Sequence, residues 1–432
     1  MDRLIRLLLL SGCLVYFTLC IASGLEISHT LHQATIAFFL AFASIVIVRY
    51  IVLLLAAIRD KIKTPNSVTT QQSPSITIIV PAFNEENLIE AALLSLAWLD
   101  YPDYEIIVVD DGSSDGTACI AHQMAARYPL TKIRVISQSN SGKSWALNTG
   151  IVHAQGDLVV CVDSDSQLNT NALKAGARHF SDPRVGAVGG FVDVINANEL
   201  ITRMQQLEYI ISQNFVRRAL SLFNVVTVVP GPIGMFRKKA IQQVGGYSTQ
   251  KDCFAEDADL TVRLLAQGWR VQGDTQMVAH TEAPNTLYSL LRQRYRWKRG
   301  LFQAFMNNIG HLLKAPNKKC IVIAGFLAFE TFLFETVNFG ITLFAITNFL
   351  AYAKLNVFLW ALVFYCFLDL VVLLFSNLEY GHFIQKTWLL LILKISYAYI
   401  LQAWGVFALL DEWLSTKMSW DKLERTGESF QG

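Results

Sequence analysis

The sequence has no marked excess of charge of either sign: 36 lysine and arginine residues stand against 34 aspartate and glutamate residues. Nucleic-acid-binding domains typically carry a basic excess, so we expect no nucleic-acid partner. Disulfide and zinc patterns are also missing, because the seven cysteines form no CxxC pair and no Cys/His metal spacing. We expect small buried thiols in a reducing compartment. Apolar residues, in contrast, make up 53% of the chain, which is high for a soluble protein.

Two long apolar runs lie near the N-terminus. The first, residues 4–21, lacks a clear small-x-small cleavage site, which argues against a secretory signal peptide. The second, residues 34–58, exceeds the roughly 20 residues needed to cross a hydrocarbon core. Basic residues within 59–63 follow it and place the next segment in the cytoplasm. Two readings of Arg49 stay open: it faces protein or a polar channel, or it extends toward the cytoplasmic surface.

Three further apolar stretches cover residues 321–352, 357–375 and 388–410. Lysines before the first stretch mark the cytoplasmic side, so simple counting puts the C-terminus outside. The basic tail at 417–425 indicates the opposite side. One stretch is therefore expected to lie in the interface or to re-enter, and 321–352 is the first candidate because it carries Glu330, Glu335 and Asn338. We expect an integral, multi-pass membrane protein.

A water-soluble region with a different texture lies between these runs. Short β-branched runs alternate with helical patterns, which predicts an α/β fold with a parallel, doubly wound sheet. Such a sheet binds nucleotides at the carboxyl ends of its strands. The expected strands are 76–80, ended by Pro81, then 105–109, 133–136 and 158–162; the expected helices are 85–99, 117–127 and 144–154.

Two later segments, 201–222 and 286–305, have amphipathic helical spacing and are expected to lie at the membrane interface beside a channel mouth. The domain organisation that we expect is as follows: 1–63, two transmembrane helices; 64–75, a polar linker; 76–310, a cytoplasmic catalytic domain with interface helices; 311–432, C-terminal transmembrane helices and a short tail.

Acidic side chains follow two of the expected strands. Asp110 and Asp111 end the second strand, and Asp163 and Asp165 follow the fourth. Asp111 can accept hydrogen bonds from a uracil ring or a ribose at the crevice edge. Paired carboxylates on a turn are hard oxygen ligands for Mg²⁺ or Mn²⁺, which offsets the negative charge of a leaving diphosphate. We therefore expect Asp163 and Asp165 to hold a metal ion beside a nucleotide.

The end of the first strand lies at the same edge and supplies Pro81, Phe83 and Glu85. Their backbone and the Glu85 carboxylate can hold the base, although Glu85 is equally suited to the first turn of the next helix. We expect Lys143 to contact a phosphate or a ribose. Its segment lacks the upstream glycine of a Walker A loop, which excludes an ATPase of that type.

Two later signatures, together with the nucleotide and metal residues above, suit the transfer of a sugar from a nucleoside diphosphate. Asp257, supported by Glu256, is expected to be the general base that takes the proton of an acceptor hydroxyl. The guanidinium of Arg296 matches the oxygens of a pyrophosphate. Trp297 offers a flat apolar face to a sugar ring. Asp259 is expected at the surface or in a cap.

Together these residues resemble the processive family-2 glycosyltransferases, the membrane synthases of cellulose, chitin, hyaluronan and poly-N-acetylglucosamine. The resemblance implies a GT-A fold and adds Gln293 to the nucleotide-sugar site and Gly231 and Pro232 to the acceptor side. Ala255 stands where many members carry threonine, which puts acceptor positioning in question. The family pattern of a uridine-binding Asp, a DxD motif, an (E/T)D base and QxxRW falls on Asp111; Asp163 and Asp165; Glu256 and Asp257; and Gln293, Arg296 and Trp297.

Among the subfamilies, the short length and two N-terminal spans are most similar to the poly-β-1,6-N-acetylglucosamine synthases. This implies UDP-N-acetylglucosamine as donor, a growing polysaccharide as acceptor and inversion at the anomeric carbon. It also implies a location in the bacterial inner membrane and export of the product through the bilayer. It leaves room for a small membrane partner subunit. The open alternatives are a hyaluronan-, chitin- or cellulose-type synthase, a non-processive transferase that adds one sugar to a lipid or glycan, and a non-catalytic transporter or sensor.

Overall fold

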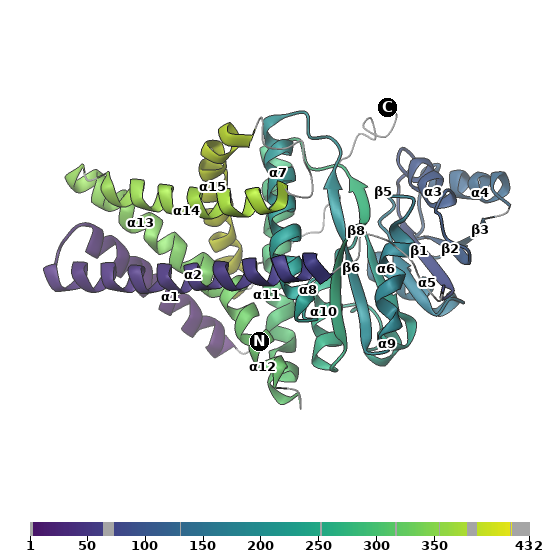
Figure 1. The fold of residues 1–432 in the computed structure, drawn as a ribbon, viewed down its shortest axis with the longest axis horizontal. Helices are drawn as coiled ribbons and strands as arrows, with labels where there is room; N and C mark the ends of the chain where they lie inside the picture. Colours follow the sequence, from purple (N-terminus) through teal and green to yellow (C-terminus); the bar gives the residue numbers. More distant parts are fainter. Residues whose placement is uncertain are drawn as a thin grey trace.

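One mixed sheet flanked by helices lies beside a group of long apolar helices (Figure 1). The computed structural model describes residues 3–63, 73–129, 131–250, 253–315, 318–353, 355–377, 387–414 and 416. The strands are β1 (Ile76–Ala82), β2 (Tyr104–Asp110), β3 (Lys132–Ser137), β4 (Leu158–Cys161), β5 (Ser166–Leu168), β6 (Val185–Val194), β7 (Gly234–Arg237) and β8 (Arg270–Thr281).

The strand order is β3-β2-β1-β4-β7-β6-β8-β5. The first four strands of this order are mutually parallel, as the alternating pattern predicts. The α/β class and its Rossmann-like half are therefore confirmed. The prediction of a wholly parallel sheet was wrong, because β7 runs antiparallel to both β4 and β6, and β5 runs antiparallel to β8.

The central strands are buried on both faces, which explains their continuous apolar runs. Ile78 and Ile106 pack into one core, while Ile79 and Ile107 point the other way into a second core. The helices on the two faces and around the sheet are α3 (Ile89–Ala97), α4 (Thr117–Arg127), α5 (Lys143–His153), α6 (Ala172–Ala177), the 3₁₀ turn η1 (Arg178–Ser181), α9 (Lys238–Gln243) and α10 (Glu256–Ala266).

Two local boundaries differ from expectation around the end of β1. The helix expected from residue 85 begins at Ile89, because Asn84 adopts a positive φ of 54° and a turn follows it. Glu85 therefore precedes the helix, which excludes its alternative first-turn role. The strand also continues through Pro81 to Ala82. The pairing of β1 with β4 ends at Ile79, so no neighbour on that side needs the missing Pro81 N–H.

Within the described residues, three helical stretches are long and apolar enough to cross a membrane: Arg6–Gly24, His29–Lys63 and Lys319–Tyr352. The apolar helices at the two ends of the chain are α1 (Arg3–Gly24), α2 (His29–Lys63), α12 (Lys319–Ala328), the π-helical turn η3 (Phe329–Leu333), α13 (Phe334–Tyr352), α14 (Asn356–Asn377) and α15 (Thr387–Trp413). The basic tail at 417–425 lies outside the described residues.

The glutamates that made 321–352 the candidate for an interfacial segment have partners inside the bundle. Arg49 Nε on α2 donates to Glu330 Oε1 at 2.6 Å. Lys298 pairs with Glu335 in the same way. Since opposite charges compensate each other, these side chains do not prevent a long apolar helix at this position. Of the two readings of Arg49, the structure favours the one in which it faces protein.

Both expected amphipathic segments are helical. The first comprises α7 (Leu200–Ile211), the π-helical turn η2 (Ser212–Arg217) and α8 (Arg218–Leu222). The second is α11 (Leu287–Lys314), which begins where the Thr286 side chain accepts a hydrogen bond from the Ser289 N–H. In Figure 1, α7, α8 and α11 lie beside the sheet, and the end of α2 reaches α8.

Candidate active site

Strand ends and helix beginnings converge at one edge of the sheet. Asp110 is the last residue of β2, and Asp163 lies just beyond β4. The helices α5 and α10 begin at Lys143 and Glu256. Parallel strands bring their carboxyl ends to one edge, which is where α/β sheets bind ligands.

Lys143 joins two of the predicted signatures. Its Nζ lies 2.6 Å from Asp163 Oδ1 and 3.2 Å from Glu256 Oε1. All three side chains are largely buried, with exposed fractions of 26% for Lys143, 21% for Asp163 and 13% for Glu256. The structure therefore brings together residues that are separated by more than a hundred positions in the sequence.

The loop that carries Gly231 and Pro232 reaches the same point. A Cβ at Gly231 would lie 3.2 Å from both Asp163 Oδ2 and Lys143 Nζ, so the absence of a side chain permits this close approach. Thr261 on α10 ties the loop to the helix that carries the acidic pair. Its Oγ1 accepts from the Val229 N–H at 3.0 Å and donates to the Asp257 carbonyl at 2.7 Å.

Asp257 follows Glu256 at the start of α10 and is partly buried. Burial raises its pKa to about 6, and the neighbouring Glu256 carboxylate acts in the same direction. The Lys143 ammonium and the Ala258 N–H, which donates to Asp257 Oδ1 at 2.8 Å, oppose this rise. A carboxylate with a pKa just below neutral is mostly ionised at pH 7 and still basic enough to accept a proton.

Asp111 lies at the predicted edge, but its oxygens already accept three hydrogen bonds. Oδ1 accepts from Gln138 Nε2 at 2.7 Å and from the Ser141 N–H at 2.9 Å, and Oδ2 accepts from the Gly142 N–H at 2.7 Å. Gly142 immediately precedes Lys143. In this structure Asp111 therefore shapes the loop that positions Lys143, and direct contact with a nucleoside stays a prediction.

The segment after β1 lies beside this loop. Asp111 N–H donates to the Ala82 carbonyl at 2.9 Å, and the Glu85 N–H donates to Thr117 Oγ1 at 2.7 Å. Phe83 is 39% exposed, which leaves a ring face for contact with a base. Asp110 Oδ1 accepts from the Ser113 N–H at 3.1 Å and stabilises the adjoining turn.

Asp165 lies in the turn between β4 and β5, where its Oδ1 accepts from Ser166 Oγ at 3.1 Å. Among the residues that the structure describes, no three His, Cys, Asp or Glu side chains form a metal-binding group. Mg²⁺ sites commonly use one or two carboxylates, with water and substrate phosphates as the remaining ligands. Asp163 and Asp165 fit that type of site, and Gly231 packs closely against Asp163 Oδ2.

The signature on α11 is only partly arranged as expected. Arg294, rather than Arg296, is buried and paired: its Nη2 lies 2.9 Å from Glu208 Oε2 and its guanidinium carbon lies 4.3 Å from the Trp297 ring centroid. Its Nη1 donates to Gln293 Oε1 at 2.6 Å. Arg296 forms no ion pair with a described side chain. Its role with a pyrophosphate, and those of Gln293 and Trp297 with ligands, stay predictions.

Close packing nevertheless ties α11 to the acidic pair. A Cβ at Gly300 would lie 2.6 Å from the Ala255 Cβ and 2.7 Å from its backbone nitrogen. Only glycine permits this approach of α11 to the residue before Glu256. Asp259 was expected at the surface or in a cap but is buried inside α10, where Asn308 Nδ2 on α11 donates to its Oδ1 at 2.8 Å and Arg263 pairs with its Oδ2.

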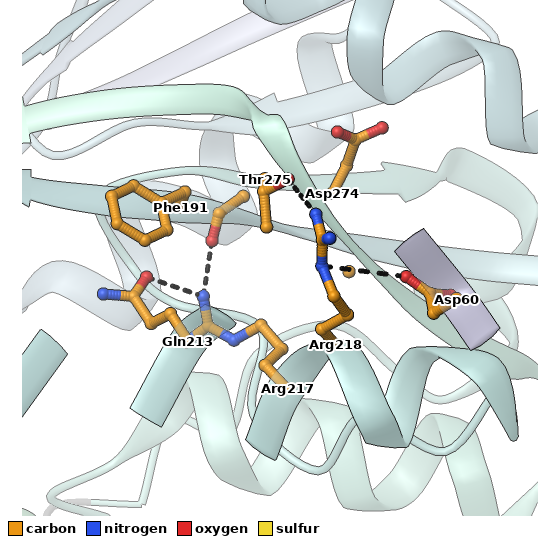
Figure 2. A pocket seen from close by; sticks show the side chains of 9 residues that line it. Asp60, Phe191, Gln213, Arg217, Arg218, Asp274 and Thr275 are labelled. Carbon is orange, nitrogen blue, oxygen red and sulfur yellow. Dashed lines mark hydrogen bonds and ion pairs between the residues drawn. The ribbon is translucent and has the colours of Figure 1, made fainter. Parts of the chain in front are cut away.

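Sequence reasoning did not assign a role to Arg217, on the interface segment η2. Burial lowers its pKa to about 10, and the charge of Asp257 partly restores it, which shows that the two groups lie within electrostatic range. Its Nη1 donates to Gln213 Oε1 at 3.0 Å. Figure 2 shows Arg217 and Arg218 side by side at a hollow that Asp60 of α2 also lines. The sequence offered one signal for Arg217, because it and Arg218 lie together near the end of an amphipathic helical pattern.

The known proteins to which this chain is similar include glycosyltransferases. Residues 77–245 match the family described as glycosyl transferase family 2. A probable glycosyltransferase of Bacillus subtilis, YdaM, is 28% identical over 84% of this chain and 89% of its own length. The poly-beta-1,6-N-acetyl-D-glucosamine synthase of Staphylococcus aureus is 30% identical over 60% of this chain. That match spans 62% of the synthase.

The fold is also similar to that of a solved structure. A mannosyltransferase from Pyrobaculum calidifontis, in complex with GDP-Man and Mn²⁺, superposes with a TM-score of 0.59 at 23% identity. The superposition covers 87% of this chain and 99% of that chain. This likeness confirms the expected GT-A fold.

Proposed function

We propose that this protein is a membrane-embedded inverting polysaccharide synthase, on the basis that residues 77–245 match glycosyl transferase family 2. Its donor is a UDP-sugar, with UDP-N-acetylglucosamine first, as the similarity to the Staphylococcus aureus synthase suggests. The observation that carries the proposal is the partly buried Asp257 carboxylate beside the Lys143 bridge between Asp163 and Glu256.

In the proposed reaction, an acceptor hydroxyl oxygen attacks the anomeric carbon of the donor sugar and its proton passes to the Asp257 carboxylate. The bond from the anomeric carbon to the diphosphate oxygen breaks, and UDP leaves with the bonding electrons. Lys143 stands where it can contact the diphosphate. Asp163 and Asp165 would hold Mg²⁺ or Mn²⁺, which supplies positive charge to the leaving group when bound.

The membrane part follows from the same arrangement. Three stretches are long enough to span a bilayer, and α8 of the interface segment packs against both α2 and β8. We place the catalytic domain in the cytoplasm of a bacterium and the polymer path through the helical bundle. The expected small partner subunit stays a prediction.

The decisive experiment measures UDP release by the purified full-length protein with a series of UDP-sugars, and GDP release with GDP-mannose as a comparison. The proposal expects release with one UDP-sugar and a long product that linkage-specific glycosidases digest. Addition of a single sugar would support a non-processive transferase, which the longer match to the Bacillus subtilis protein also permits. Release with no nucleotide sugar in the presence of Mg²⁺ or Mn²⁺ would refute the enzyme proposal.

Asp257→Asn provides the residue-level test. We expect it to bind UDP like the unmodified protein and to lose transfer by at least about 10²–10⁴-fold, the usual contribution of a general base. Asp103→Asn, which neutralises a carboxylate that is 60% exposed, is the matched control and should retain activity. Retained turnover in Asp257→Asn would remove this residue from the base role.

A further inference from the structure

Lys143 occupies an unusual place between the two acidic signatures. A residue that contacted only the diphosphate of a donor would need no carboxylate partner of its own. Lys143 instead holds Asp163 at 2.6 Å and Glu256 at 3.2 Å. It therefore neutralises the first carboxylate of the DxD motif while also fixing the start of α10.

The Lys143 ammonium is surrounded by carboxylates. It pairs directly with Asp163 and Glu256 and lies within electrostatic range of Asp257. The ammonium is thus a built-in cation within a cluster of three negative charges. A divalent cation that approached Asp163 in this state would meet a like charge at hydrogen-bond distance from its ligand.

The small number of protein ligands also disfavours binding of a free divalent cation at Asp163. The described residues offer no group of three metal-binding side chains at this edge. Two carboxylates, one of them engaged by Lys143, leave most of the coordination shell to water or to substrate phosphates. A diphosphate would supply both missing features, because it brings oxygen ligands for the metal and a negative partner for the ammonium.

We propose that Lys143 is an internal counter-ion that keeps free divalent cations off Asp163 until a nucleotide diphosphate arrives and takes over the ammonium. The inference rests on the proposed function and adds a binding order to it. Metal and nucleotide bind synergistically, because the diphosphate draws Lys143 from Asp163 and completes the metal site. Lys143 is thus a positioning residue whose removal strengthens metal binding and weakens nucleotide binding.

The first test measures Mn²⁺ binding to the full-length protein in lipid nanodiscs. Electron paramagnetic resonance without nucleotide shows whether removal of Lys143 strengthens or weakens this binding. We expect weak binding to the unmodified protein and at least about tenfold tighter binding to Lys143→Met, within the usual range of coupling between sites. Lys143→Arg keeps the positive charge and should bind Mn²⁺ as weakly as the unmodified protein. Lys132→Met removes an ammonium that is 72% exposed and should change nothing.

Adding UDP gives the second reading. UDP should tighten Mn²⁺ binding to the unmodified protein by about tenfold or more and should tighten it less in Lys143→Met, since the counter-ion is already gone. Unchanged or weaker Mn²⁺ binding in Lys143→Met would overturn the inference. So would tight Mn²⁺ binding to the unmodified protein without nucleotide, a measurement that does not depend on the folding of any variant.

UDP release by the unmodified protein separates the two claims. If a UDP-sugar is turned over but the Mn²⁺ affinities do not follow the expected order, the counter-ion role is wrong and the enzyme proposal stands. If no nucleotide sugar is turned over, the enzyme proposal itself fails.

Discussion

Asp257 can serve as a base only when it has lost its proton, so the environment of this one carboxyl sets a lower pH limit for activity. Burial and the adjacent Glu256 both favour the protonated form and raise the pKa to about 6. The ordinary aspartate value is about 3.9. At pH 7 about nine tenths of the molecules carry the ionised base, and the fraction falls as the pH drops through 6.

We therefore expect kcat/KM for UDP release to fall about tenfold per pH unit below pH 6. Glu256→Gln removes the nearest negative charge, lowers the pKa of Asp257 and should move this limb to lower pH. Asp103→Asn should leave the limb in place. A profile that stays flat from pH 7 to 4.5 would show that the titrating base is another group.

At the scale of elements, α11 connects the acidic pair to the bundle. Gly300 brings it against Ala255, and the neighbouring Arg299 reaches α15, where its Nη2 lies 2.8 Å from Glu412 Oε2. Both side chains of this pair are almost fully buried, at 4% and 7% exposed. Gln303 Nε2 donates to the same oxygen at 3.1 Å. The ion pair therefore fixes α11 relative to α15.

Removing one partner of a buried ion pair leaves an uncompensated charge, which costs roughly 3–5 kcal/mol. We expect Arg299→Met to lower the free energy of unfolding by about this amount and to reduce transfer, because α11 also packs against Ala255. Thermal unfolding in detergent and UDP release measure the two effects. Lys314→Met, at the exposed end of the same helix, should match the unmodified protein in both assays. Equal stability of Arg299→Met would show that the pair does not hold α11.

These elements also show what the sequence can reveal. The strands β1 to β4 and their helices follow from local periodicity, because each apolar run reflects burial at its own position. The antiparallel placement of β7 does not, since it depends on pairing with strands far away in the sequence. Motif residues such as Asp163 and Glu256 were identified individually. Their bridge through Lys143 and the contact of Gly300 with Ala255 exist only after folding.

At the scale of the whole molecule, the basic residues at one end of α2 predict which parts of the chain lie on each side of the membrane. The short connection between α1 and α2 includes Ser28, which is exposed and lies at the opposite end of α2 from Lys61 and Lys63. The catalytic domain follows that basic end. If α2 crosses the inner membrane with its basic end inside, Ser28 lies on the outer side and the domain in the cytoplasm.

Thiol labelling tests this arrangement with a native reporter. Cys119 on α4 is exposed, whereas four other cysteines are buried. In intact spheroplasts, we expect a membrane-impermeant maleimide to spare Cys119 and to label a Ser28→Cys variant made in a Cys119→Ser background. A permeant maleimide should label Cys119 as well. Labelling of Cys119 by the impermeant reagent would put the catalytic domain on the outer side, away from the cytoplasmic nucleotide sugars, and would contradict the proposed synthase.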